Sequence, residues 1–200
     1  MKRYKIVLTG GPCAGKTTAI EEVKKHLTNK GFCVITVFET ATEMITGGIS
    51  PKNVGQIVFQ KNLLRLQLTK ESVFSQCAES LGKDVVILLD RGVFDGKAYL
   101  KDFEFSQILD ELNLCEQDLL NAYDAVIFLD SVASDCDGNY TTSNNTARSE
   151  TREEAAQINE RTYNVWKNHK NLHIIKNEET FDYKISKLLD IIDNLIVKMY

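Results

Sequence analysis

Five short apolar runs alternate along the chain with longer segments in which apolar residues recur every three or four positions. The runs are continuous and rich in β-branched residues, which is typical of parallel strands buried on both faces. They cover residues 4–9, 33–38, 84–89, 125–129 and 172–176. Strands that alternate with helices predict an α/β fold, in which a five-stranded parallel sheet lies between two layers of helices.

The segments between these runs have the spacing, or the start and stop signals, of helices. Helices are expected over residues 18–29, 40–45, 54–81, 151–168 and 181–199 and after Gly92, and residues 106–122 are expected to add one or two more. Thr40 with Glu43, and Thr151 with Glu154, have the three-residue spacing of a capping box. Both threonines are therefore predicted to cap a helix.

A polar segment interrupts the alternation between the fourth strand and the helix that follows it. Residues 131–146 are rich in Ser, Asn, Asp, Gly and Thr, a composition typical of a mobile loop. Together with the start of the next helix, residues 131–152 form a predicted helical lid. Neither an internal repeat nor an interdomain linker is visible, so residues 1–200 are expected to form a single domain.

The turn after the first strand carries the strongest chemical signal. Residues 10–17 read GGPCAGKT and fit the phosphate-binding pattern G-x-x-x-x-G-K-[ST], between a strand and a helix as the pattern requires. The alternative is an ordinary glycine-rich turn with a solvated lysine. Lys16 is expected to reach the β- and γ-phosphates of a nucleotide, and Thr17 to offer its hydroxyl to Mg²⁺. The sequence therefore predicts a three-layer αβα P-loop NTPase fold.

Backbone N–H groups and the helix N-terminus complete the predicted nucleotide site. Because Pro12 has no N–H, the donors are expected mainly from Cys13 to Thr18. Asn177 follows the fifth strand and is a candidate for the wall of the base pocket. The candidate nucleotide-binding residues are Gly11, Cys13, Ala14, Gly15, Lys16, Thr17, Thr18 and Asn177.

Charged residues follow the second and third strands, where ligands of parallel α/β sheets bind. Asp90 ends a hydrophobic strand and is expected to hold the Mg²⁺ shell with Thr17, through water. The alternative for Asp90 and Arg91 is a surface ion pair. Motor-type ATPases commonly carry a water-activating glutamate where this chain has Arg91, so the sequence argues against a motor.

Two further acids are candidates for the same pocket. Glu39 could take a proton from an acceptor hydroxyl or position that hydroxyl, and the alternative is a solvated loop acid. Asp95 could face the pocket, or act only as an acid at the start of a helix.

Arg148 and Arg152 lie where the polar segment enters the next helix. Arginines on a closing lid can neutralise charge on a transferring phosphoryl group, and the alternative is a pair of solvated side chains. Positive charge at a helix N-terminus is unfavourable, which favours a functional role. The candidate catalytic residues are thus Lys16, Glu39, Asp90, Arg91, Arg148 and Arg152.

Composition limits the kinds of partner. The formal net charge is -4, which argues against a general nucleic-acid binder. No stretch approaches the length of a transmembrane segment, and the apolar run after the basic N-terminus is too short for a signal peptide, so a cytoplasmic protein is expected. The five cysteines show no paired metal spacing. The histidines, His26, His169 and His173, are expected at the surface or at the edges of helices and strands.

Three motifs resemble one group of P-loop domains. They are GGPCAGKTT, DRGVFDGKAYL and NNTARSETREEA, and a strand, a loop and a helix close the chain. This combination resembles the NadR/TRPL-translocation-defect type of P-loop domain, sometimes labelled AAA-like, whose architecture is near that of nucleoside and nucleotide kinases. The resemblance covers nearly the whole chain. It implies nucleotide binding, and its members include nicotinamide riboside kinase domains and a trafficking protein similar to GTP- and phosphoinositide-binding proteins.

Two functions follow as expectations. The first is a Mg²⁺-dependent kinase that transfers the γ-phosphate of ATP to a small-molecule, nucleoside- or nucleotide-like acceptor. The second is a regulatory module that hydrolyses ATP or GTP slowly and binds a protein or phosphoinositide partner. The guanine-specificity motif of GTPases is missing, so the sequence gives no support for GTP.

Overall fold

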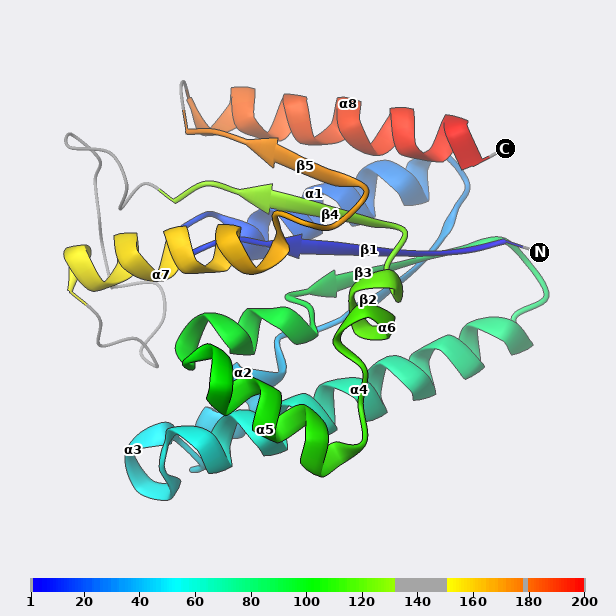
Figure 1. The fold of residues 1–200 in the computed structure, drawn as a ribbon. Helices are drawn as coiled ribbons and strands as arrows, with labels where there is room; N and C mark the ends of the chain where they lie inside the picture. Colours follow the sequence, from blue (N-terminus) through cyan, green and yellow to red (C-terminus); the bar gives the residue numbers. More distant parts are fainter. Residues whose placement is uncertain (1, 132–150, 178–179, 200) are drawn as a thin grey trace.

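The computed structural model describes residues 2–131, 151–177 and 180–199 of the chain (Figure 1). Its centre is a five-stranded sheet with strand order β2-β3-β1-β4-β5, and all of the pairings are parallel. The strands are β1 (Arg3–Thr9), β2 (Cys33–Val37), β3 (Val85–Asp90), β4 (Ala125–Leu129) and β5 (Leu172–Ile175). The predicted five-stranded parallel sheet and three-layer P-loop fold are confirmed.

Helices cover both faces of the sheet, and the strand arrowheads in Figure 1 point toward the side where α7 lies. The helices are α1 (Lys16–Asn29), α2 (Thr40–Thr46), α3 (Pro51–Val54), α4 (Gln56–Ser80), the 3₁₀ helix η1 (Val93–Tyr99), α5 (Asp102–Leu112), α6 (Glu116–Asn121), α7 (Arg152–Trp166) and α8 (Phe181–Met199). Within the described residues, none of these helices combines the length and the apolar character that a membrane crossing requires.

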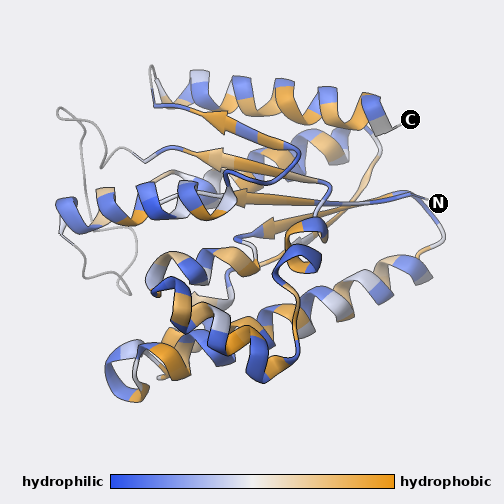
Figure 2. Ribbon diagram, viewed as in Figure 1, coloured by the Kyte–Doolittle hydropathy of each residue, from blue (hydrophilic) through white to orange (hydrophobic). Residues whose placement is uncertain are grey.

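Alternating residues of each strand feed two separate cores. On one face, Ile6 and Leu8 of β1 pack with residues of α1 and α8, while on the other face Val7 packs with residues of α4, α5 and α7. Figure 2 shows the matching pattern on the helices, whose apolar sides turn toward the sheet. The single-domain assignment of residues 1–200 stays a prediction.

The predicted helices agree with the observed ones except in detail. The helix expected over 54–81 is α4, which begins at Gln56 because Gly55, with a φ of 84°, breaks the helical path and separates α4 from the short helix α3, which was not predicted. The helix expected after Gly92 is the 3₁₀ helix η1.

The one or two helices expected over 106–122 are two, α5 and α6, and α5 begins earlier, at Asp102. Helix α5 ends at its C-cap Asn113, which has a left-handed φ of 53°. A single residue with a left-handed φ changes the hydrophobic spacing very little, so such helix ends are hard to predict from the spacing.

One of the two capping predictions is confirmed. Thr151 accepts a hydrogen bond from Glu154 N, and the Glu154 carboxylate accepts one from Thr151 N, so the capping box of α7 is complete. The prediction for Thr40 was wrong. Glu39 occupies the N-cap of α2, and the Thr40 hydroxyl donates instead to Gln67 Oε1 on α4.

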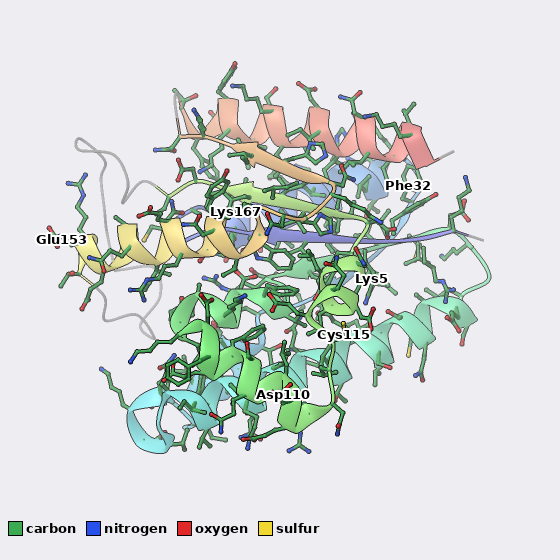
Figure 3. All side chains as sticks on the ribbon, in the orientation of Figure 1. Lys5, Phe32, Asp110, Cys115, Glu153 and Lys167 are labelled. Atoms are coloured by element: carbon green, nitrogen blue, oxygen red, sulfur yellow. The ribbon has the colours of Figure 1, made fainter. Side chains whose placement is uncertain are left out.

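A buried network of polar side chains connects α4 to the start of η1. Glu71 of α4 is 3% exposed and accepts hydrogen bonds from Gln67 Nε2 and the Tyr123 hydroxyl at 2.9 Å each. Lys5, labelled in Figure 3, lies 3.2 Å from the same carboxylate. The Tyr123 hydroxyl in turn accepts from Val93 N at 3.1 Å, so the network holds the first residue of η1.

His169 was expected at the surface or at the edge of a helix or strand, and it lies just after the end of α7 but not at the surface. The side chain is buried, its Nε2 lies 3.1 Å from Tyr123 O, and Asn171 N donates to its Nδ1 at 3.2 Å. Burial lowers the pKa of His169, which favours the neutral ring. The carbonyl that allows this burial comes from a segment 46 residues away, which no local pattern could reveal.

Trp166, the single tryptophan of the chain, closes the core under η1. It is fully buried, with edge contacts to Phe94 and Tyr123, and its Nε1 donates to Asp95 Oδ2 at 3.3 Å. An added Cβ at Gly92 would lie 2.7 Å from the indole, so the ring fills the space that this glycine leaves. The end of α7 is therefore fixed against the start of η1.

Trp166→Ala should destabilise the fold by about 3–5 kcal/mol, because it opens a large cavity and removes a buried hydrogen bond. Trp166→Phe should cost less, since the ring contacts are partly kept. Chemical denaturation followed by far-ultraviolet circular dichroism measures both values. A loss below about 1 kcal/mol for the alanine variant would contradict this packing.

Candidate active site

The loop between β1 and α1 has the backbone of a phosphate cradle. Gly10 has a φ of 146°, and an added Cβ there would lie 2.0 Å from Leu129 O of β4. Cys13 and Gly15 have left-handed φ values of 59° and 81°, which turn the chain sharply before α1. The two glycines are thus required by close approach and by conformation.

Lys16 lies folded over this loop. Its side chain is buried, and Nζ donates to Gly10 O at 3.0 Å and to Gly11 O at 2.9 Å. Thr17 and Thr18, the next residues of α1, are exposed. The ammonium group is therefore held at the mouth of the loop, and the two hydroxyls are accessible beside it.

Residues from the C-terminal half of the chain also hold the loop in place. Lys184 of α8 donates to Ala14 O at 3.2 Å and to Asp130 O, and the Ser131 hydroxyl donates to Pro12 O. An added Cβ at Gly15 would lie 2.4 Å from the ring of Phe181 at the start of α8. These contacts fix the loop without using the N–H groups of Cys13 to Thr18.

Asn159 of α7 makes a direct contact with the loop. Its Oδ1 accepts from Gly11 N at 3.0 Å, and its Nδ2 donates to Asp130 Oδ1 at 2.6 Å. With the Gly11 N–H engaged and no N–H on Pro12, phosphate donors must come from farther along the loop, as the sequence indicated. Asn159 carries no local sequence signal, because it acts through the packing of a helix almost 150 residues away.

Arg91 occupies the centre of a charged cluster beside the loop. Its Nε donates to Glu39 Oε1, and its Nη1 lies 3.1 Å from Asp95 Oδ1 and 3.3 Å from Gly10 O. Burial opposes the charge of Arg91, but Glu39 and the other nearby acidic groups raise its pKa well above the ordinary value. The alternative of a surface ion pair is wrong, since the Arg91 side chain is only 13% exposed.

Glu39 is the other half of this pair. Burial would raise the pKa of its carboxyl, but Arg91 and Lys16 outweigh that effect and lower it to about 2. The Thr42 hydroxyl also donates to Glu39 Oε2, at 2.7 Å. A carboxylate with so low a pKa is a weak base, so these contacts favour positioning over proton abstraction.

Asp90 is buried at the end of β3 and differs from Glu39 in its environment. Burial and the charge of Glu39 raise the pKa of Asp90. Its Oδ1 is buried and has no hydrogen-bond partner among the described residues. An unsatisfied carboxylate oxygen fits a role toward Mg²⁺, which is usually bound by one or two carboxylates, waters and substrate phosphates.

Thr17 is the second candidate ligand for Mg²⁺. Thr17 offers an exposed hydroxyl at the start of α1. Within residues 2–131, 151–177 and 180–199, no set of three or more His, Cys, Asp or Glu side chains is arranged to hold a metal by itself. Any Mg²⁺ bound here would therefore need phosphate oxygens or waters in addition to Asp90 and Thr17.

Asp95 joins the site to α7. Its carboxylate accepts from the Thr9 hydroxyl, from Arg91 Nη1, from Gly92 N at 2.9 Å and from Trp166 Nε1. The residue is 4% exposed, so these four donors compensate for its burial. Of the two interpretations of Asp95, the pocket acid and the acid at a helix start, the geometry supports both.

A cavity of about 760 Å³ opens next to the charged cluster. Pro12 of the loop, Glu39, Arg91 and Asp95 line one part of it. The remaining walls come from α2, α3, α4, η1 and α7, and include Ile45, Phe59, Leu63 and Tyr99. A volume of this size is typical of a small-molecule site.

A family model described as an AAA domain matches residues 5–182 of the chain. The chain belongs to this AAA-domain family. The match covers the loop, the strand ends and the helices that surround the cavity. The AAA-like P-loop membership that the motifs indicated is therefore confirmed.

Solved structures show which type of P-loop fold this AAA-domain protein has. Thymidylate kinase from Ehrlichia chaffeensis is similar with a TM-score of 0.67 and 12% identity, over 96% of this chain and 100% of that chain. Deoxyadenosine kinase from M. mycoides, solved with bound dATP, is similar with a TM-score of 0.55 and 17% identity, over 95% of this chain and 99% of that chain. The fold is thus of the nucleotide-kinase type. No curated protein sequence matches the chain.

The remaining sequence-based candidates of the AAA-domain protein lie in different places. Arg148 lies outside the described residues. Arg152 is half-buried at the first position of α7 and does not line the cavity, whereas Arg161, farther along the same helix, does. Glu153 and Lys167 mark the two ends of α7 in Figure 3. Asn177 is half-buried after β5 and also lies away from the cavity lining.

Asp90→Asn and Thr17→Val should each raise the Mg²⁺ concentration needed for half-maximal ATP turnover without unfolding the protein. The wild-type requirement should also rise on acidification, because a raised pKa makes Asp90 take up a proton at a higher pH than an ordinary aspartate. Glu39, with a pKa of about 2, stays ionised over the same range. Magnesium titrations at several pH values measure this. Full turnover of Asp90→Asn at limiting Mg²⁺ would remove Asp90 from the site.

Proposed function

We propose that this AAA-domain protein is a Mg²⁺-dependent kinase that transfers the γ-phosphoryl group of ATP to a hydroxyl of a nucleoside- or nucleotide-like acceptor. The observation that carries the proposal is the position of the cavity. The cavity is lined by Glu39, Arg91 and Asp95, and Arg91 also donates a hydrogen bond to Gly10 O of the phosphate loop. The cavity therefore begins beside the loop, and its other walls come from the surrounding helices. A hydrolase needs only a water molecule at that position, whereas a kinase needs room for a second substrate.

The residues of the loop would act first on the nucleotide. Lys16 would exchange its two carbonyl partners for β- and γ-phosphate oxygens, and the N–H groups of Cys13 to Thr18 would cradle the phosphates. Asp90 and Thr17 would hold Mg²⁺, which when bound neutralises charge on the phosphates.

Arg91 and Glu39 lie between the loop and the cavity. Phosphoryl transfer passes through a loose transition state, so positioning and charge stabilisation matter more than a strong base. Arg91 is held by Glu39 and Asp95 and donates to Gly10 O. We propose that it acts as a fixed cation where the two substrates would meet. Glu39 would orient the acceptor hydroxyl with its second oxygen, in agreement with its low pKa.

The charges around the cavity favour an acceptor without a phosphate group. Among the described residues, three cationic side chains, Lys52, Arg91 and Arg161, and three acidic ones, Glu39, Asp95 and Glu154, line it. Arg91 is already neutralised by two of these acids. A nucleoside monophosphate would bring about two negative charges into a site with no cationic excess. A nucleoside-like molecule fits better.

Acceptor-dependent ATP turnover tests this function. Purified protein would be incubated with Mg-ATP and, separately, with nucleosides, nucleoside monophosphates and phosphoinositide headgroups. The proposal expects at least one nucleoside-like compound to raise turnover and to appear as a phosphorylated product by mass spectrometry. Slow turnover that none of the compounds stimulates would favour the regulatory NTPase instead.

A further inference from the structure

Gln60 of α4 is a buried polar side chain in the wall of the cavity. It is 6% exposed and belongs to the cavity lining. Its Oε1 is buried and has no hydrogen-bond partner among the described residues. A buried amide oxygen without a partner has lost its hydrogen bonds to water without replacement, so the protein carries an unfavourable group at this position.

Two other glutamines on the same side of α4 do not share this feature. Gln56 Nε2 donates to Tyr99 O at 3.4 Å. Gln67 accepts from the Thr40 hydroxyl and donates to Glu71 Oε1 at 2.9 Å. The fold can therefore satisfy glutamines along this stripe, and it leaves Gln60 unsatisfied where the helix borders the cavity.

The surroundings of Gln60 are suited to a flat ring. Phe59 precedes it on α4, and Tyr99 of η1 also lines the cavity. An added Cβ at Gly96 would lie 2.7 Å from Gln60 Oε1, so the missing side chain at this position gives the carboxamide its room. Aromatic side chains and a buried amide in the wall of one cavity are typical of sites that bind a heterocycle.

We propose that Gln60 selects the acceptor by hydrogen bonding to the edge of its ring, where an N–H donor stands beside an acceptor atom. A carboxamide offers one acceptor and two donors, so it pairs with amide-type or amidine-type edges of heterocycles. This inference rests on the proposed function, because it assigns the ring of the phosphate acceptor to the cavity. Gln60 is a specificity-determining residue and takes no part in the transfer of the phosphoryl group.

Matched nucleosides test the proposal. Uridine, adenosine and guanosine would each be compared with a derivative methylated on the N–H group of its pairing edge, by calorimetry and by kcat/KM with Mg-ATP. For the preferred nucleoside, wild type should favour the unmodified compound by roughly tenfold to a hundredfold. Gln60→Leu should reduce that preference to about twofold or less. Gln76→Leu, on an exposed glutamine of the same helix, should keep it.

Thermal unfolding of the ligand-free protein supplies a second readout. Gln60→Leu replaces an amide whose Oε1 is unsatisfied by an apolar group of similar size, so its Tm should equal or exceed that of wild type. A clearly lower Tm would mean that Gln60 serves the fold, and would overturn the proposal. A preference retained by Gln60→Leu would overturn it as well.

The outcomes also separate this proposal from the kinase activity. Discriminating binding without phosphate transfer would support Gln60 and contradict the kinase. Phosphate transfer to a nucleoside and its methylated derivative at equal rates would support the kinase and overturn the role of Gln60. If none of the nucleosides binds to wild type, the role of Gln60 is overturned.

Discussion

Lys16→Ala should weaken Mg-ATP binding by at least about a hundredfold and abolish measurable ATP turnover. A charge-assisted hydrogen bond is worth about 1.5–3 kcal/mol, and the ammonium group is expected to make more than one to the β- and γ-phosphates. The substitution also removes one of the two cations that lower the pKa of Glu39. Isothermal titration calorimetry measures the loss of affinity directly.

Two controls separate this loss from unfolding. Lys16→Met keeps most of the buried stem while removing the charge, so it should bind Mg-ATP as poorly as the alanine variant and melt near wild type. Lys24→Ala, on an exposed lysine of the same helix, should change neither binding nor stability. Unchanged affinity in both Lys16 variants would contradict the assignment of the loop as the nucleotide site.

The arginines of the predicted lid, Arg148 and Arg152, and Arg161 of α7 should divide into two kinetic classes. Arg148→Ala or Arg152→Ala should lower kcat by roughly 10³-fold or more with a much smaller change in ATP affinity, because a lid arginine acts on charge that develops in the transition state. Arg161→Ala should chiefly raise the KM of the acceptor, since Arg161 lines the cavity. Steady-state kinetics with ATP and the acceptor varied separately distinguish the two classes.

Arg65→Ala is a matched control for these three variants, because Arg65 is exposed on α4 and does not line the cavity. Its kinetic constants should match wild type. If the arginine variants instead alter only ATP affinity or partner binding, the protein acts as a nucleotide switch. Turnover that neither an acceptor nor these arginines affect would exclude the kinase.

The strands and the longest amphipathic helices could be predicted from the sequence because their signals are local. The bounds of β4 and α8 agree with the predicted residues 125–129 and 181–199. Continuous apolar runs leave few alternatives to a buried parallel strand. The long helix α4 was predicted as residues 54–81, but its start after Gly55 and the short helix α3 before it were missed, because apolar spacing does not report a single backbone reversal.

The candidate site divides in the same way. The phosphate loop is a contiguous motif, so its residues could be named in advance, and the strand-end rule located Glu39, Asp90 and Arg91. Asn159 and Trp166 act through the packing of α7 against the loop and η1, which the chain order does not show. Gln60 has the spacing of an ordinary buried stripe, and only the missing hydrogen-bond partner distinguishes it.

The central claim is that the γ-phosphoryl group of ATP moves to an organic hydroxyl and not to water. ATP labelled on its γ-phosphate would be incubated with the protein, Mg²⁺ and the best nucleoside of the acceptor screen, with Lys16→Met as the inactive control. The account predicts that the label appears on the nucleoside in wild type alone. Label found only in inorganic phosphate, at a rate that the nucleoside does not change, would contradict it.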